Sequence, residues 1–369
     1  MEKYPTTNQT LRNLAATAIY TILLLALITA AARQNNSLTR QRLTGKAGIA
    51  PQVTDPPAAL SFIVVGLGAF RGLAAEALWF RADQLQLEGR YFELVQLASW
   101  ITALDPYAAD AWAYNAWNLS YNISALMLRD EDRARWVFHG ISLLRDEALK
   151  WNPASAQLCR ELAWLYLHKV GDNLDRAAPL YRKQLSTQIS PLLGDSGLYP
   201  NTSVGQQLLC ENWRLNKESV SQLTRQVGLL DWRQAESHAL YWGLEGVART
   251  QNSAEVFKCR RIACHAMMAL IERHQCSDLL PALLNQLAQL YKETPSPAVR
   301  RLYSLYIIKA IQQASATGNH NESERLYTIL LKVAAKDYMI PLLKDLLEDK
   351  TTGNDLLKPL QQGVLHGEK

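Results

Sequence analysis

The stretch that decides the fold is Gly89-Arg-Tyr-Phe-Glu-Leu-Val-Gln-Leu-Ala-Ser-Trp-Ile-Thr-Ala-Leu-Asp-Pro106. Its apolar residues recur at helical spacing, and the proline marks the end of the helix because proline cannot continue one. Gly89 and Tyr91 then stand at a turn, and Ala98 lies on the helix that follows it. The helix before the turn is expected over 75–88.

The spacing of these residues closely resembles the second half of a tetratricopeptide repeat, a unit of about 34 residues that closes near a proline. The resemblance implies pairs of antiparallel helices joined at a small residue, with Ala98 at a point of close helix approach. It also implies that stacked pairs form a superhelix with an extended groove.

A second unit begins with Trp112 and Ala116, four residues apart on one helical face, and closes at Pro153. Pro106 and Pro153 are 47 residues apart (153 − 106), which is about 13 more than the repeat period. We therefore expect a longer loop between the two helices of this unit, at about 124–131.

Less regular units follow the second. A third is suggested by the run 161–166, the turn at Gly171-Asp172 and a helix over 176–185, and a weaker echo begins at Gly318. No series of strands and turns appears anywhere after residue 60. The sequence thus predicts an all-α fold, a degenerate tetratricopeptide-like α-solenoid that follows a single N-terminal transmembrane helix.

The chain divides by composition and pattern into six parts. The resemblance covers 75–186 and, less specifically, 297–335, whereas 187–296 is helical by pattern only, with a loop expected over 190–205. The parts are an N-terminal tail (1–13), a transmembrane anchor (14–32), a tether (33–57), tetratricopeptide-like repeats (58–186), a further helical-repeat region (187–349) and a flexible tail (350–369).

The anchor is predicted from nineteen consecutive uncharged residues over 14–32, bounded by Arg12 and Arg33, which is enough to cross a bilayer. A cleaved signal peptide is the competing interpretation, since 30–32 is Ala-Ala-Ala, but the apolar run exceeds the usual signal-peptide length. We expect a single-pass protein of a bacterial inner membrane. The flanking charges leave the side of the soluble body open.

The segment 61–78 carries Gly66, Gly68 and Gly72 and looks like a dinucleotide-binding loop, with Glu88 near the place of the ribose-binding acid. A nucleotide domain needs further strands, yet the residues after Gly89 have helical periodicity. We expect Gly68 and Gly72 to be close-packing points of a lead helix. A nucleotide-binding protein or enzyme using Gly66–Gly72 is the alternative.

The helix expected over 111–123 carries Asn115, Asn118 and Asn122 on one side. Side-chain amides both donate and accept hydrogen bonds, so such a stripe can bind an extended peptide backbone. The alternative is that these amides hold neighbouring helices or the loop after residue 124, because buried amides are usually satisfied internally.

Three aromatic residues, Tyr114, Trp117 and Tyr121, turn to the opposite side of the same helix. If this side lines the groove that the repeat resemblance implies, they form a partner-binding surface together with Asp110. Packing against the next helix is the alternative.

Other classes of function find little support. The net charge of +5 is scattered among almost as many acids, which argues against nucleic-acid binding. No metal site is expected, because Cys259 and Cys264 point about 140° apart on a helix. No catalytic motif occurs, no cofactor or small-molecule substrate is predicted, and His168 and His238 are expected to be packed side chains.

The sequence therefore predicts a membrane-anchored helical-repeat scaffold that binds protein partners in the assembly of a membrane or envelope complex. The combination of anchor, proline-containing tether and tryptophan-rich repeats also resembles bacterial membrane-anchored helical-repeat proteins, a resemblance that implies no particular activity.

Overall fold

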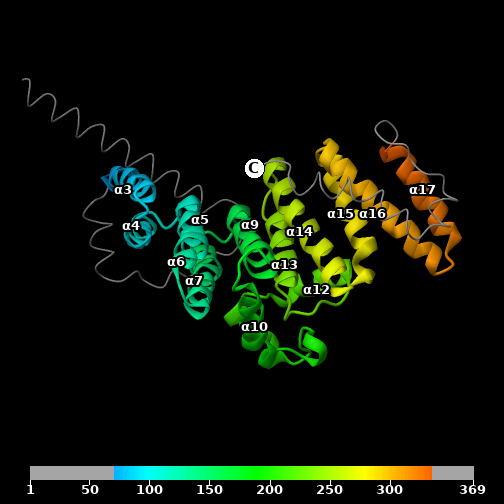
Figure 1. Ribbon diagram of the computed structural model, residues 1–369, viewed down its shortest axis with the longest axis horizontal. Helices are drawn as coiled ribbons and strands as arrows, with labels where there is room; N and C mark the ends of the chain where they lie inside the picture. The colour runs from blue at the N-terminus through cyan, green and yellow to red at the C-terminus, as the bar shows by residue number, and fades with distance from the viewer. Residues whose placement is uncertain (1–69, 335–369) are drawn as a thin grey trace, which may run out of the picture.

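A computed structural model describes residues 70–334, and within this range every regular element is a helix. The helices follow one another along the long axis of the molecule, from α3 to α17 (Figure 1). The all-α prediction is confirmed for these residues. The predicted anchor (14–32), the tether, Gly66, Gly68 and the tail lie outside them, and Gly72 lies within α3.

The first two helices lie where the sequence places them. α3 spans Phe70–Leu87 and α4 spans Tyr91–Leu104, and they pack against each other. Gly89 has a φ of +70° in the turn between them, a conformation that costs glycine little and other residues more. The chain then leaves the helical conformation at Asp105, next to Pro106.

The next pair departs from the prediction. Its first helix runs through α5 (Ala109–Trp117), the π-helical turn η1 (Asn118–Ile123) and α6 (Ser124–Leu126). Its second helix runs through α7 (Asp130–Ser142), the π-helical turn η2 (Leu143–Ala148) and α8 (Leu149–Trp151). The loop expected at 124–131 is wrong, because the connection is only 127–129. The extra residues lengthen the helices instead.

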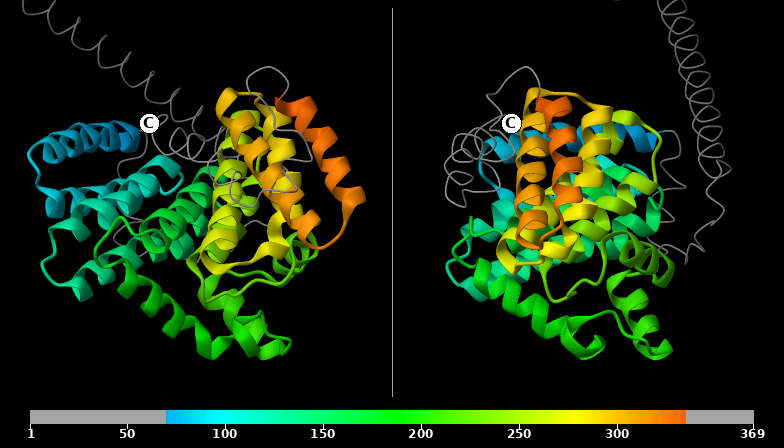
Figure 2. Two further views of the ribbon diagram at one scale, coloured as in Figure 1. Left: turned by 45° about the vertical axis from the view of Figure 1, so that its right-hand side comes forward. Right: turned by 90° about the vertical axis from the view of Figure 1, so that its right-hand side faces the viewer.

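A third pair consists of α9 (Ala156–Trp164), continued by the π-helical turn η3 (Leu165–Gly171), and α10 (Ala178–Ile189). An irregular segment follows, with two short 3₁₀ turns, Ser190–Leu192 and Asp195–Gly197, where the sequence predicts a loop. α10 and this segment lie to one side of the other helices (Figures 1 and 2).

The second half of the row is regular. It contains α11 (Ser203–Trp213), α12 (Lys217–Val227), α13 (Ala235–Ala248), α14 (Ser253–His274), the short 3₁₀ turn η6 (Ser277–Leu279), α15 (Leu280–Glu293), α16 (Pro297–Ala316) and α17 (His320–Ala334). α13 packs on α14 and α9, and α14, α15, α16 and α17 then pack in sequence order. Gly318, with a φ of +76°, lies in the turn between α16 and α17.

One continuous apolar core extends from Trp112 in α5 to Ala334 at the end of α17. The core continues across residues 186 and 187, where the sequence analysis divides the two helical regions by their resemblance to the repeat family. The pair α3–α4 has its own smaller cluster, which includes Leu94 and Ile101 and reaches Ala111 in α5. In the part of the chain that the structure describes, no helix combines the length and the apolar character needed to cross a membrane.

Candidate functional site

The predicted aromatic residues of the second pair meet the first helix of the third pair. The rings of Trp117 and Tyr121 lie 5.0 Å apart, the Tyr121 hydroxyl is 3.0 Å from Nδ1 of His168, and the ring of Trp164 stacks on His168 at 4.5 Å. We call these four side chains the aromatic row. It arises because α5–η1 and α9–η3 lie next to each other.

The aromatic row is partly open to solvent. Trp117 is 43% exposed, and the other three members are half-buried. Burial raises the pKa of Tyr121, so its hydroxyl keeps its proton at neutral pH. Burial also lowers the pKa of His168, so its imidazole is neutral, and Nδ1 and the Tyr121 hydroxyl share a hydrogen bond. The result is an uncharged surface of rings.

A buried network of charged side chains lies next to the aromatic row and contacts it through Lys169. The Lys169 ammonium lies 5.0 Å from the centre of the Tyr121 ring and donates to Asp175 at 2.6 Å. Asp175 also accepts from Arg133 at 3.0 Å and from Tyr181 at 3.1 Å. The network ties α7, η3 and α10 together, which holds the third pair in a fixed position against the second.

The other two residues predicted for this surface lie elsewhere. Tyr114 faces the first pair, where its hydroxyl donates to Gln86 at 2.5 Å and its ring contacts Trp79 edge-on. Asp110 is exposed and accepts from Gln157 at 2.6 Å. The structure therefore brings together Trp117 and Tyr121 from the predicted set, without Tyr114 or Asp110.

The amide stripe is mostly interior. Asn115 and Asn118 are 3% and 1% exposed, and Asn122 is half-buried and donates to Oδ1 of Asn118. Here α7 packs closely on the first helix of the pair, since a methyl group at Gly140 would lie 2.8 Å from the Ala116 carbonyl oxygen in α5. The burial of Asn115 and Asn118 leaves little of these amides for a partner, and Oδ1 of Asn115 and Nδ2 of Asn118 also have no hydrogen-bond partner among residues 70–334.

Two members of the aromatic row, Trp164 and His168, were missed by the sequence reasoning. A signal for them exists, because they are four residues apart on one helix and therefore share a face. The network behind the row has no local signal, since Arg133 and Asp175 are 42 residues apart.

A pocket elsewhere in the protein also has no signal in the sequence. Three arginines approach it from different elements: Arg145 from η2, Arg214 from the α11–α12 connection and Arg249 from the end of α13. These residues are up to 104 positions apart (249 − 145), so no motif joins them.

The described residues hold no cluster of three or more histidine, cysteine, aspartate or glutamate side chains that converge on one point. Cys259 and Cys264 are both buried, and burial raises the pKa of each thiol. His238 is fully buried, as expected of a packed side chain. The described residues also form no strand, so they contribute nothing to the sheet that a loop at Gly66–Gly72 would need.

Comparison of the sequence with protein-family models gives no match. Comparison of the sequence with curated proteins also gives no match.

Proposed function

We propose that the protein is a membrane-anchored helical scaffold that binds a protein partner through the aromatic row. The observation that carries the proposal is the exposure of Trp117 beside Tyr121 and His168, on helices whose backbone is held by a buried charged network. Exposed tryptophan and tyrosine on a rigid support are typical of residues that dominate protein interfaces.

The proposal includes a tetratricopeptide-like arrangement of the helix pairs and an anchor over 14–32. Its support is the order of the helices: α5–η1 and α9–η3 are the first helices of consecutive pairs and lie side by side, as the repeat resemblance implies. Phe80, Phe92 and Trp100 on the first pair are also exposed apolar side chains, and they are further candidates for contact with a partner. An anchor at a bacterial inner membrane would confine this surface near its partners.

Site-specific photocrosslinking in the native membrane tests the partner surface. A photoreactive phenylalanine analogue at position 117 is expected to give a discrete crosslinked species, because this side chain is exposed within the row. The matched control places the same analogue at Leu229, which is 72% exposed and lies on the α12–α13 connection. No adduct at 117, or the same adduct from both positions, contradicts the proposed surface.

Alkaline extraction of membranes tests the anchor separately. The full chain is expected to stay in the membrane pellet, and a chain lacking residues 1–33 is expected to move to the supernatant with unchanged helical circular dichroism. Release of the full chain contradicts the anchor without bearing on the aromatic row.

A further inference from the structure

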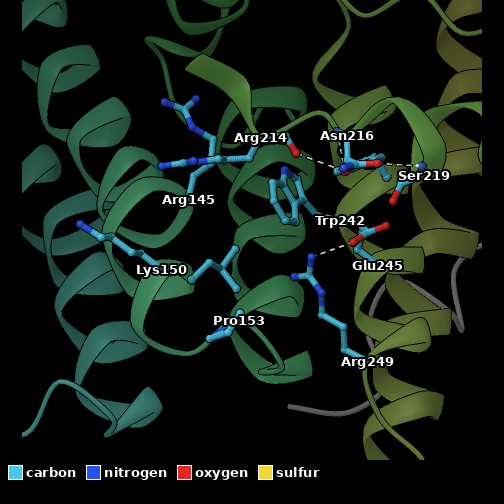
Figure 3. A pocket seen from close by; sticks show the side chains of 11 residues that line it. Arg145, Lys150, Pro153, Arg214, Asn216, Ser219, Trp242, Glu245 and Arg249 are labelled. Carbon is cyan, nitrogen blue, oxygen red and sulfur yellow. Dashed lines mark hydrogen bonds and ion pairs between the residues drawn. The ribbon is translucent and has the colours of Figure 1, made fainter. Parts of the chain in front are cut away.

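A basic pocket of about 460 Å³ opens between η2–α8, the α11–α12 connection and α13 (Figure 3). Its charged lining consists of Arg145, Lys150, Arg214, Glu245 and Arg249. In Figure 3 the guanidinium groups of Arg145 and Arg214 lie on the same side of the Trp242 ring, whereas Arg249 approaches from the opposite end and Lys150 extends away. The pocket is therefore dominated by arginine.

The carboxylates beside the pocket do not balance its arginines. Arg145 forms an ion pair of 2.7 Å with Asp146, and Arg249 forms one of 2.7 Å with Glu245. Arg214 lies 3.8 Å from Asp146, whose two oxygens already accept from Arg145. Three guanidinium groups thus share two carboxylates, which leaves an excess of positive charge inside a concavity.

A helix terminus adds to this charge. Asn216 caps α12 with its side-chain oxygen, which accepts from the N–H groups of Glu218 and Ser219, so the positive end of the α12 dipole lies at the pocket wall. This dipole favours a negatively charged occupant. The indole nitrogen of Trp242, which also lines the pocket, is buried and has no hydrogen-bond partner among residues 70–334.

The backbone at Arg214 has a conformation that favours glycine. Arg214 ends α11 in the left-handed conformation, with φ of 55° and ψ of 27°. Glycine is the usual residue there, because a side chain in this region costs about 1 kcal/mol. The guanidinium of Arg214 is nevertheless placed at the pocket, with its side chain 47% exposed.

We infer that this basic pocket binds a small organic oxyanion, either a phosphate monoester or a dicarboxylate. Guanidinium groups bind both through paired charge-assisted hydrogen bonds. The volume lies within the range of small-molecule sites and exceeds what a bare phosphate needs, so the pocket has room for an oxyanion that carries an organic body. The inference does not rest on the proposed partner surface, because the two sites share no residue.

Isothermal titration calorimetry on the full chain in detergent micelles tests the inference, with inorganic phosphate, phenyl phosphate and succinate as probes at low salt. Phenyl phosphate or succinate is expected to bind with a Kd below about 1 mM, and the affinity is expected to fall as salt is added. The tighter of the two identifies the class. If neither binds, or if inorganic phosphate binds as tightly as both, the inference fails.

The substitution Arg214→Gly separates binding from folding. It is expected to weaken binding at least tenfold while the melting temperature stays the same or rises, because glycine relieves the left-handed backbone. The matched control is Gln275→Gly, which changes another left-handed residue at a helix end, that of α14, outside the pocket. Binding that survives Arg214→Gly, or that Gln275→Gly abolishes equally, overturns the assignment.

Discussion

Replacing Asp175 with asparagine is expected to destabilise the protein by about 3 kcal/mol, because it removes the carboxylate with which two buried cations form ion pairs. The Asp175 carboxylate accepts from Lys169 at 2.6 Å and from Arg133 at 3.0 Å, and the Lys169 and Arg133 side chains are 8% and 13% exposed. Asparagine keeps the shape of the side chain but replaces one acceptor oxygen by a donor, so the effect reports the lost charge together with the lost hydrogen bonds.

The magnitude follows from the pKa of Asp175. Burial alone would raise this pKa, but the hydrogen bonds from Lys169 and from the Ala177 backbone, with the charge of Arg133, lower it from 3.8 to about 2. A shift of almost two units corresponds to about 2 kcal/mol in favour of the ionised form. The loss in the variant is larger, because a buried Lys169 without its partner adds its own desolvation cost.

The assay is urea unfolding followed by far-ultraviolet circular dichroism. The matched control is Asp130→Asn, since Asp130 pairs with Arg176 at 3.0 Å but both side chains are largely exposed. That change is expected to cost no more than about 1 kcal/mol. A loss for Asp175→Asn below about 1 kcal/mol, or equal to the control, would refute the reasoning. Adding Lys169→Met to Asp175→Asn should recover part of the loss.

The lowered pKa of Asp175 also makes the free energy of unfolding depend on pH in the acid range. Because the pKa of folded Asp175 is lowered, its contribution is complete above the unfolded value of 3.8 and is lost as pH falls towards 2. The decline of the free energy of unfolding in this window should be smaller in Asp175→Asn, because the contribution of Asp175 is missing, whereas other carboxylates with lowered pKa values, such as Asp231 and Glu272, still contribute.

Two further predictions concern His238 and Gly197. Burial lowers the pKa of His238 from 6.5 to about 4, so between these pH values the unfolded state binds a proton that the folded state does not bind. The free energy of unfolding should therefore fall by about 3 kcal/mol as the pH drops from 6.5 to 4. Urea titrations of His238→Phe across this range should lack that contribution, and an unchanged dependence of the free energy of unfolding on pH would contradict it. Gly197→Ala should destabilise by about 2 kcal/mol or more, because φ is +80° and the new methyl group would lie 2.8 Å from Cγ of Asp231. Gly89→Ala, at φ +70° with nothing within 4 Å, is the control for the backbone cost alone, and equal losses would show that the contact with Asp231 is unimportant.

The extent to which the sequence predicts the candidate sites differs between them. Trp117 and Tyr121 were found because helical periodicity places residues four apart on one face. Tyr114 and Asp110 were grouped with them by the same rule, but Tyr114 sits toward the preceding pair and contacts Gln86, because one helix has neighbours on both sides. Periodicity assigns a face, and it does not say which neighbour covers each part of that face.

What the sequence by itself determined is local: the turn at Gly89, the helix end before Pro106 and the helical character of the segments on either side of them. These depend on the conformational limits of single residues. Tertiary packing decided the rest. It lengthened the second pair where a loop was expected and buried Asn118 under α7. It also gathered arginines from distant helices into one pocket, because contacts between distant residues depend on how helices stack, which no local pattern encodes.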